Sequence, residues 1–199
     1  MLNQYLQSFS HALSETLIST REGEDLSLDE GMNRCLDCFF KVKEKNAKLI
    51  FIGNGASSSI SSHFSADFLK NGGLRSLCFT DAALMSCLGN DLGFENCFAE
   101  PVARFSEAGD LLVAISSSGN SKNILKAAEV AKSKSCRVLT LTGFTRENQL
   151  RQMGDLNIYV PSPIGHYGTI ESAHTLILHC LIDEFCKSVS ERESDKPCI

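Results

Sequence analysis

A serine-rich turn, Ser116-Ser117-Ser118-Gly119-Asn120-Ser121, lies between an apolar run and an amphipathic segment. It offers several hydroxyl groups, a glycine that lets the backbone approach a ligand closely, and the unpaired N–H groups of a helix start. A helix N-terminus carries about half a positive charge, so it binds anions readily. Capping that helix needs only Asn120 or Ser121, and the surplus of hydroxyls therefore favours a phosphate-binding turn.

A second turn of the same kind is Gly53-Asn54-Gly55-Ala56-Ser57, again between an expected strand and an expected helix. It lacks the lysine of a P-loop and the third glycine of a dinucleotide-binding motif, which argues against a nucleotide cofactor. Ligands of parallel sheets collect at the carboxyl ends of the strands. Two such turns at one sheet edge therefore predict a small phosphorylated ligand that lies across both.

Carboxylates and histidines recur at helical spacing. His63 and Asp67 are four residues apart, so they share one helix face, as a metal-binding pair, an acid–base pair or an ordinary surface ion pair would. Glu171 and His179 lie on one side of the last expected helix, about 12 Å apart along its axis, and both could reach one ligand between them. His174, among apolar residues of that helix, is expected to be a buried histidine with a hydrogen-bond partner.

Composition limits the class of protein. The 199 residues fit one domain, and the net charge of −5 disfavours nucleic acid and anionic membranes as partners. No apolar run approaches the ~20 residues that span a bilayer, and we expect no secretory signal at the N-terminus. The nine cysteines are odd in number and many lie in apolar segments, so we expect free thiols in a reducing cytoplasm. Cys35 and Cys38 have CxxC spacing inside a helical pattern, which favours a structural role.

The elements that must position these groups follow from hydrophobic periodicity. Apolar runs alternating with helical segments predict a single α/β domain, a three-layer sandwich around a five-stranded, mostly parallel sheet. Two amphipathic helices within residues 1–47 would form a pair that packs against another subunit, residues 48–189 would form the main domain, and residues 190–199 a disordered tail. The expected strands are 48–52, 77–79, 111–115, 137–141 and 156–160, and the expected helices are 2–20, 27–45, 57–71, 82–88, 95–106, 121–134 and 168–188.

Five motifs in this order resemble the sugar isomerase (SIS) domain, and most of all its phosphoheptose isomerases. They are Gly53-Asn54-Gly55-Ala56-Ser57, His63, Leu88-Gly89-Asn90-Asp91-Leu92-Gly93-Phe94, Ile115-Ser116-Ser117-Ser118-Gly119-Asn120-Ser121 and the Glu171…His179 helix. The resemblance covers nearly the whole chain. It implies a flavodoxin-like or Rossmann-like fold, a homotetramer with active sites between subunits, and a zinc ion or another divalent metal.

The resemblance also implies roles for individual residues. Catalytic groups would be His179, Asp67 and Glu171, and metal ligands would be His63, Asp67, Glu171 and His179. Contacts to phosphate or sugar would come from Asn54, Gly55, Ser57, Asp91, Ser116, Ser117, Ser118 and Ser121. Two positions depart from the family pattern, because Asp67 stands where the family has Glu and Glu171 stands where it has Gln. Either Asp67 acts as a shorter base or Glu171 replaces it as the working carboxylate.

The expected activity is an aldose–ketose isomerisation of sedoheptulose 7-phosphate that supplies a heptose for bacterial lipopolysaccharide or capsule. Moving a carbonyl between C1 and C2 needs groups that take and return a proton, and a carboxylate with a histidine is the usual pair. Two alternatives remain open. One is a non-catalytic sugar-phosphate-binding regulator or scaffold, and the other is an isomerase of another ketose phosphate, such as a hexulose phosphate.

Overall fold

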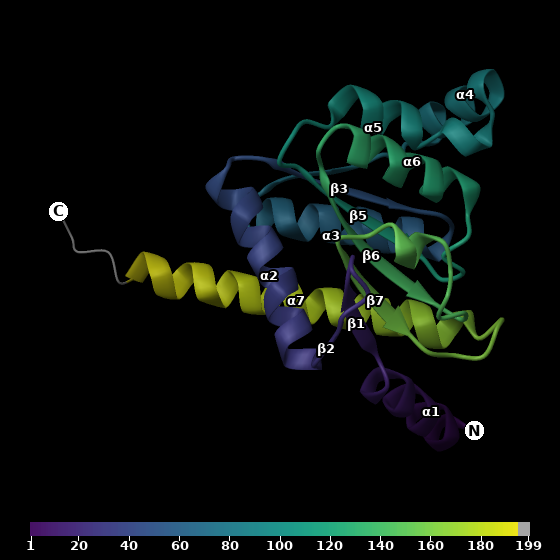
Figure 1. Cartoon of the computed structure of the whole chain (residues 1–199), viewed down its shortest axis with the longest axis vertical. Helices are drawn as coiled ribbons and strands as arrows, with labels where there is room; N and C mark the ends of the chain where they lie inside the picture. Colours follow the sequence, from purple (N-terminus) through teal and green to yellow (C-terminus); the bar gives the residue numbers. More distant parts are fainter. Residues whose placement is uncertain (195–199) are drawn as a thin grey trace.

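The structure, a computed structural model, describes the backbone of residues 1–194 and the side chains of residues 1–192. A seven-stranded sheet in the order β2-β1-β7-β6-β5-β3-β4 forms its centre (Figure 1). Strands β3 to β7 are parallel, whereas β1 is antiparallel to both β7 and β2. The strands are β1 (Leu17–Thr20), β2 (Asp25–Leu26), β3 (Lys48–Gly53), β4 (Arg75–Cys78), β5 (Leu111–Ser116), β6 (Arg137–Gly143) and β7 (Leu156–Val160).

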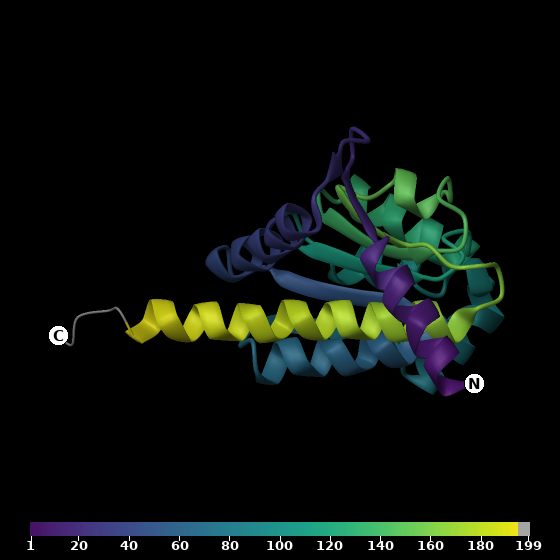
Figure 2. The ribbon, with the colours of Figure 1, turned by 90° about the horizontal axis from the view of Figure 1, so that it is seen from below.

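Helices cover both faces of the sheet, which confirms the expected three-layer α/β architecture (Figures 1 and 2). One layer holds α1 (Leu2–Ser14), α2 (Leu28–Glu44), α3 (Ala56–Lys70) and α7 (Tyr167–Ser194). The opposite layer holds α4 (Ala82–Leu92), α5 (Ala99–Phe105) and α6 (Lys122–Ser133). Two short 3-10 turns, η1 (Phe94–Asn96) and η2 (Leu150–Gln152), complete the chain.

Strand β3 shows why the sheet is apolar on both sides. Leu49 and Phe51 pack into the core under α3 and α7, while Ile50 and Ile52 pack into the core under α5 and α6. All four side chains are at most 1% exposed. A continuous apolar run of this kind is typical of a parallel strand that helices cover on both faces.

The expectation of a single helix over residues 2–20 is wrong. Helix α1 ends at Ser14, and Leu17 begins β1, which pairs with β7 and with the short β2. Leu17 and Ile18 continue the helical spacing of α1, but Ile18 is buried against Gly31 of α2, where a Cβ would lie 2.6 Å from it. Tertiary pairing overrides local periodicity here. The sheet therefore has seven strands instead of five, and residues 1–47 form a helix–hairpin–helix unit instead of a helical pair.

The helix expected over residues 82–88 is longer in the structure, because Gly89, Asn90 and Asp91 also belong to α4. Asp81 caps this helix through a 2.9 Å bond to the Leu84 N–H, and the helix ends at Gly93, whose φ is +82°. The expected helix 95–106 divides into η1 and α5.

Helix α7 is longer than expected and extends beyond the sheet (Figure 2). It runs to Ser194, so the expected tail starts too early, and its remainder, 195–199, lies outside the described residues. Within the described part of the chain, no helix is both long and apolar enough to cross a membrane.

Candidate active site

The two turns lie side by side, as their sequence predicts. β3 and β5 are parallel neighbours in which Gly53 pairs with Ile115, so both strands end at the same sheet edge. A pair of amides bridges the turns. Asn54 Nδ2 donates to Asn123 Oδ1 at 2.9 Å, and Asn123 Nδ2 donates to Asn54 Oδ1 at 2.8 Å.

The serine-rich turn depends on Gly119. Its φ of +64° is a left-handed conformation, and a Cβ there would lie 1.9 Å from Asn148 Oδ1. The Gly119 N–H donates to the Ser116 carbonyl at 3.0 Å, and its own carbonyl accepts from Leu150 N at 2.9 Å. The hydrogen bond from Leu150, the first residue of η2, thus stabilises this conformation of the turn.

The hydroxyl of Ser121 is not used for capping. Ser121 occupies the N-cap position of α6, yet its side chain makes no capping bond. Ser116 and Ser117 are buried, and Ser118 is half-buried, with its hydroxyl accepting from Asn120 N at 3.3 Å. The simpler explanation, that Ser121 is present as a helix cap, is therefore not supported.

The first turn, at the end of β3, leads directly into α3 and its residue Ser57. Gly55 precedes α3 with φ +55° and ψ −124°, a conformation that glycine adopts without a side-chain penalty. Ser57 lies in the first turn of α3 and is 5% exposed. A Cβ on Gly53 would lie 2.5 Å from the Ser57 carbonyl oxygen, so this tight strand-to-helix turn also requires glycine.

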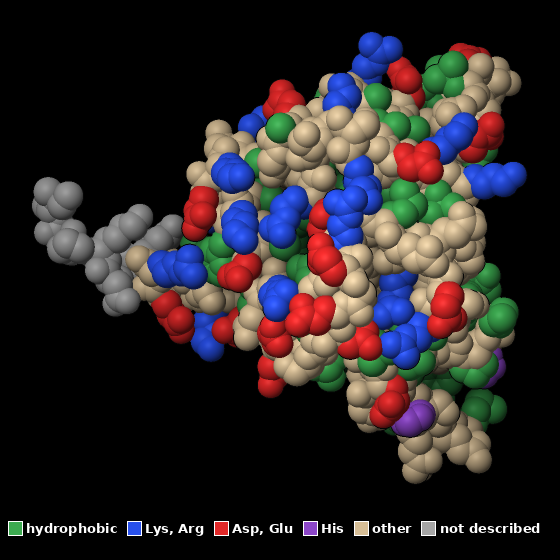
Figure 3. Space-filling view, viewed as in Figure 1, with side chains coloured by type: hydrophobic (Ala, Val, Ile, Leu, Met, Phe, Trp, Pro, Cys, Tyr) green, Lys and Arg blue, Asp and Glu red, His purple; other side chains and the backbone are tan. Residues whose placement is uncertain are grey.

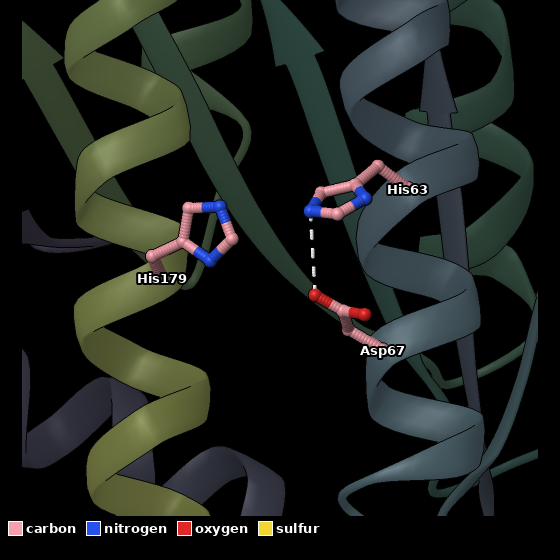
Figure 4. Close-up of side chains that lie close together, drawn as sticks. All are labelled: His63, Asp67 and His179. Atoms are coloured by element: carbon pink, nitrogen blue, oxygen red, sulfur yellow. Dashed lines mark ion pairs between the residues drawn. The ribbon is translucent and has the colours of Figure 1, made fainter.

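His63, Asp67 and His179 form one cluster between α3 and α7 (Figure 4). His63 Nε2 lies 3.3 Å from Asp67 Oδ2, and the rings of His63 and His179 have centroids 5.2 Å apart. One ligand atom from each of the three residues lies within 4.8 Å of the others. Spacing predicted the His63–Asp67 pair, but only the packing of α7 on α3 brings His179 to it.

A groove of about 590 Å³ between α3 and α7 joins this cluster to the first turn. It begins at Ala56, directly after Gly55, and reaches His179. Glu171 lines the groove too, but it lies outside the three-residue cluster. Sequence reasoning did not identify Ser59 and Thr175, which line the groove beside it, since an isolated serine or threonine on a helix has no distinctive spacing.

His174 lies beneath the site and does not face the groove. Its side chain is fully buried, and Nε2 lies 3.2 Å from the Thr142 carbonyl oxygen. Because a carbonyl only accepts, Nε2 carries the hydrogen, while Nδ1 has no partner among the described residues. Burial lowers the pKa of His174 to about 4. The expectation of a buried, hydrogen-bonded histidine is confirmed.

The Asp91 carboxylate makes hydrogen bonds within α4. Its carboxylate accepts from Asn90 Nδ2 at 2.8 Å and from the Cys87 thiol at 3.5 Å, within the exposed helix α4. Neither of these bonds, from Cys87 Sγ and Asn90 Nδ2, joins Asp91 to the sheet edge. The expected contact between Asp91 and the sugar stays a prediction.

A cavity larger than the groove between α3 and α7, about 830 Å³, lies elsewhere, between α1 and the segment before α7. His11 and Arg146 line it, and none of the expected site residues does. The CxxC pair also lies away from the groove, on α2. Cys35 and Cys38 are buried, burial raises the pKa of both thiols, and the eight described cysteines are free.

Comparison with known proteins agrees with this architecture. A family model described as the SIS domain matches residues 8–143. Phosphoheptose isomerase from Helicobacter pylori strain P12 is 32% identical over 189 residues, which cover 92% of this chain and 95% of the relative. Phosphoheptose isomerase from Shewanella loihica is 29% identical over 195 residues, which cover 95% and 96%. The structure of the Neisseria gonorrhoeae phosphoheptose isomerase has a TM-score of 0.80 at 27% identity and covers 92% of this chain and 97% of that one.

The α/β fold, with two glycine- and serine-rich turns at the carboxyl edge of its parallel strands, defines the class of protein. The chain belongs to the SIS-domain family. Within that family it matches phosphoheptose isomerases over nearly its whole length.

Proposed function

We propose that the chain is a phosphoheptose isomerase, an aldose–ketose isomerase that converts sedoheptulose 7-phosphate into a heptose 7-phosphate. The observation that carries this proposal is the groove between α3 and α7, which runs from Ala56, beside the first of the two paired strand-end turns, to His179. A phosphate anchored at the turns would direct the rest of the sugar along the groove. The related proteins are named phosphoheptose isomerases, and this name supports a seven-carbon sugar as the substrate.

The phosphate end is assigned to the two turns. Hydroxyls and backbone N–H groups at a helix start bind an anion without a nearby lysine. The small residues at both turns allow close backbone approach. The proposed phosphate contacts are Asn54, Gly55, Ser57, Ser116, Ser117, Ser118 and Ser121, and the proposed sugar contact is Asp91.

The proton transfer is assigned to Glu171. Its carboxylate lines the groove, and it takes no part in the cluster of His63, Asp67 and His179. In the ketose-to-aldose direction, Glu171 removes a proton from C1 and returns it to C2, while the hydroxyl proton passes from O1 to O2. A carboxylate in that position acts as general base and then as general acid.

The cluster fits a divalent metal. Two imidazole nitrogens and one carboxylate oxygen form a donor set found in catalytic zinc sites, and the three ligand atoms already lie within 4.8 Å. His63, Asp67 and His179 would hold the ion, and a bound zinc ion would supply a Lewis acid for the substrate carbonyl. Asp67, one methylene shorter than Glu, is then a ligand and not the base.

Assembly and cell location complete the proposal. Helix α1 exposes Leu2, Tyr5 and Leu6, and an apolar groove of about 210 Å³ lies between α1, α2 and α7. These surfaces support a homotetramer in which the segment 1–47 contacts another subunit. Free thiols agree with a cytoplasmic enzyme that supplies heptose for surface polysaccharide.

The test is incubation of the purified chain with sedoheptulose 7-phosphate, with and without added zinc, followed by detection of the aldose product. We expect product, and more of it with zinc. Thermal stabilisation by the sugar phosphate without any product would overturn the enzyme and support a sugar-phosphate-binding regulator. Turnover of a hexulose phosphate in preference to the seven-carbon sugar would instead identify the isomerase of another ketose phosphate.

A further inference from the structure

Asn123, in the first turn of α6, joins the two turns of the candidate phosphate site. It is 3% exposed, and its amide pairs reciprocally with that of Asn54 at the end of β3. Asn54 belongs to the first turn, whereas Asn123 follows the serine-rich turn by two residues. This pair of hydrogen bonds therefore spans the gap between the strand ends where the phosphate would sit.

All the hydrogen-bonding capacity of the Asn123 amide is used inside the protein. Besides Asn54, its Nδ2 donates to Cys97 Sγ at 3.4 Å, and its Oδ1 accepts from Ile124 N at 3.0 Å. A primary amide has two N–H donors and two acceptor positions, so none remains for a ligand. Cys97 is fully buried, so this bond holds the Asn123 side chain to the protein interior.

Asn54 differs in both respects. It is half-buried, and its amide uses one donor and one acceptor on Asn123. One N–H and one acceptor position of Asn54 therefore remain for a ligand. Because Asn123 holds both ends of the Asn54 amide, it decides which way these remaining groups point.

We propose that Asn123 is a positioning residue that fixes the separation of the two turns and the orientation of Asn54, and so sets the affinity for a phosphorylated sugar. It touches no substrate itself. This inference rests on the proposed function for its substrate, but the phosphate affinity can be measured without turnover. A buried residue with a structural role alone would change stability and leave that affinity unaltered.

The experiment compares Asn123→Leu with the wild-type chain. Leucine has a similar volume but leaves Asn54 without its hydrogen-bond partner. We expect this loss to lower the affinity for the phosphorylated sugar roughly tenfold. We expect the KM for sedoheptulose 7-phosphate to rise about tenfold with kcat within threefold, because anchoring acts equally on ground and transition states. Lys126→Ala is the matched control, since it removes a bond from the exposed face of the same helix to Asn96 and should leave KM unchanged.

A double-variant cycle tests the coupling directly. If Asn123 acts through Asn54, the variant Asn54→Ala/Asn123→Leu should have the same KM as Asn54→Ala alone. Multiplying effects would show that the two side chains act independently and would overturn the inference. So would an unchanged KM in Asn123→Leu.

Two further measurements keep the result decisive. Where Asn123→Leu does not fold, Asn123→Ser suits a helix start but is too short to reach Asn54, and the same KM rise is expected.

Where the wild-type chain shows no turnover, the proposed function fails, and the inference is judged by inorganic phosphate. Its dissociation constant, from thermal shifts, should rise about tenfold in the Asn123 variant and not in Lys126→Ala. A wild-type chain that binds no phosphate overturns both.

Discussion

Asp67 and Glu171 are carboxylates on two helices in contact, α3 and α7, with different surroundings. Asp67 faces a histidine at 3.3 Å within a three-residue cluster, whereas Glu171 lines the groove outside it. Spacing along each helix predicted the pairs His63–Asp67 and Glu171–His179 separately. It could not show that His179 joins the first pair and leaves Glu171 apart, because that division depends on how α3 and α7 pack.

Replacing Glu171 with Gln separates the two carboxylates by role. The substitution keeps the shape and removes the base, so we expect kcat to fall at least ~100-fold, the contribution of a general base. Zinc binding, measured by calorimetry, should be unchanged. Retained turnover in Glu171→Gln would instead assign the proton transfer to Asp67.

Replacing His179 with Ala removes one of three proposed ligands. We expect turnover to be lost and zinc affinity to fall by at least ~10-fold. His11→Ala, which changes a histidine of the separate large cavity, is the control and should retain both properties. Full activity of His179→Ala would remove the cluster from the active site.

His174 makes stability depend on pH. Its folded pKa, about 4, lies below the usual value of 6.5, so the unfolded chain binds a proton first as the pH falls. The stability from the neutral ring is complete above pH ~6.5 and is lost towards pH ~4, on the order of 3 kcal/mol. Urea unfolding across this range should show a shallower decline for His174→Gln than for wild type. Parallel declines would mean that another group is responsible.

At the scale of the elements, the turns were the most predictable feature. Strands β3, β5 and β6 end in Gly53, Ser116 and Gly143, and local chemistry determines the turns that follow such residues. β1 was missed because Leu17 and Ile18 match the helical spacing of α1, while the β7 backbone that pairs with them is remote in sequence. The bridge between Asn54 and Asn123 was missed for the same reason, since it joins two elements.

The close approach of Asn148 to Gly119 predicts the effect of Gly119→Ala. The new Cβ would meet Asn148 at 1.9 Å in a left-handed conformation, so the turn must move. We expect weaker phosphate binding and a loss of about 1–3 kcal/mol of stability. Gly165→Ala is the matched control, because its φ is +90° but nothing lies within 4 Å. It should lose some stability and keep phosphate affinity. Equal phosphate affinity in both variants would contradict the prediction.

At the scale of the whole molecule, the apolar side chains at the surface of α1 bear on assembly with other subunits. Figure 3 shows that Lys, Arg, Asp and Glu mix over one face of the protein, including the face of α2. In contrast, Leu2 is 68% exposed and Leu6 is 52% exposed. Exposed apolar residues on one helix are typical of a surface that a partner covers.

Leu6→Lys is therefore expected to weaken assembly. Sedimentation should show a tetramer for the wild-type chain and smaller species for the variant, because a charge would be buried at the contact. Phe105→Lys, at an exposed apolar side chain in the opposite layer, should remain tetrameric. A tetramer in both variants would exclude α1 from the interface.

The pairing of β1 with β7 has a consequence for folding. Ser19 lies opposite Asn157, 138 residues later in the chain, and the Asn157 side chain donates to the Ser19 carbonyl. During synthesis, β1 leaves the ribosome long before its partner strand exists. The hairpin must wait unpaired until β7 has joined β6, so closing this edge is a late, non-local step that slows folding. Until then its backbone N–H and C=O groups offer a free edge to other chains.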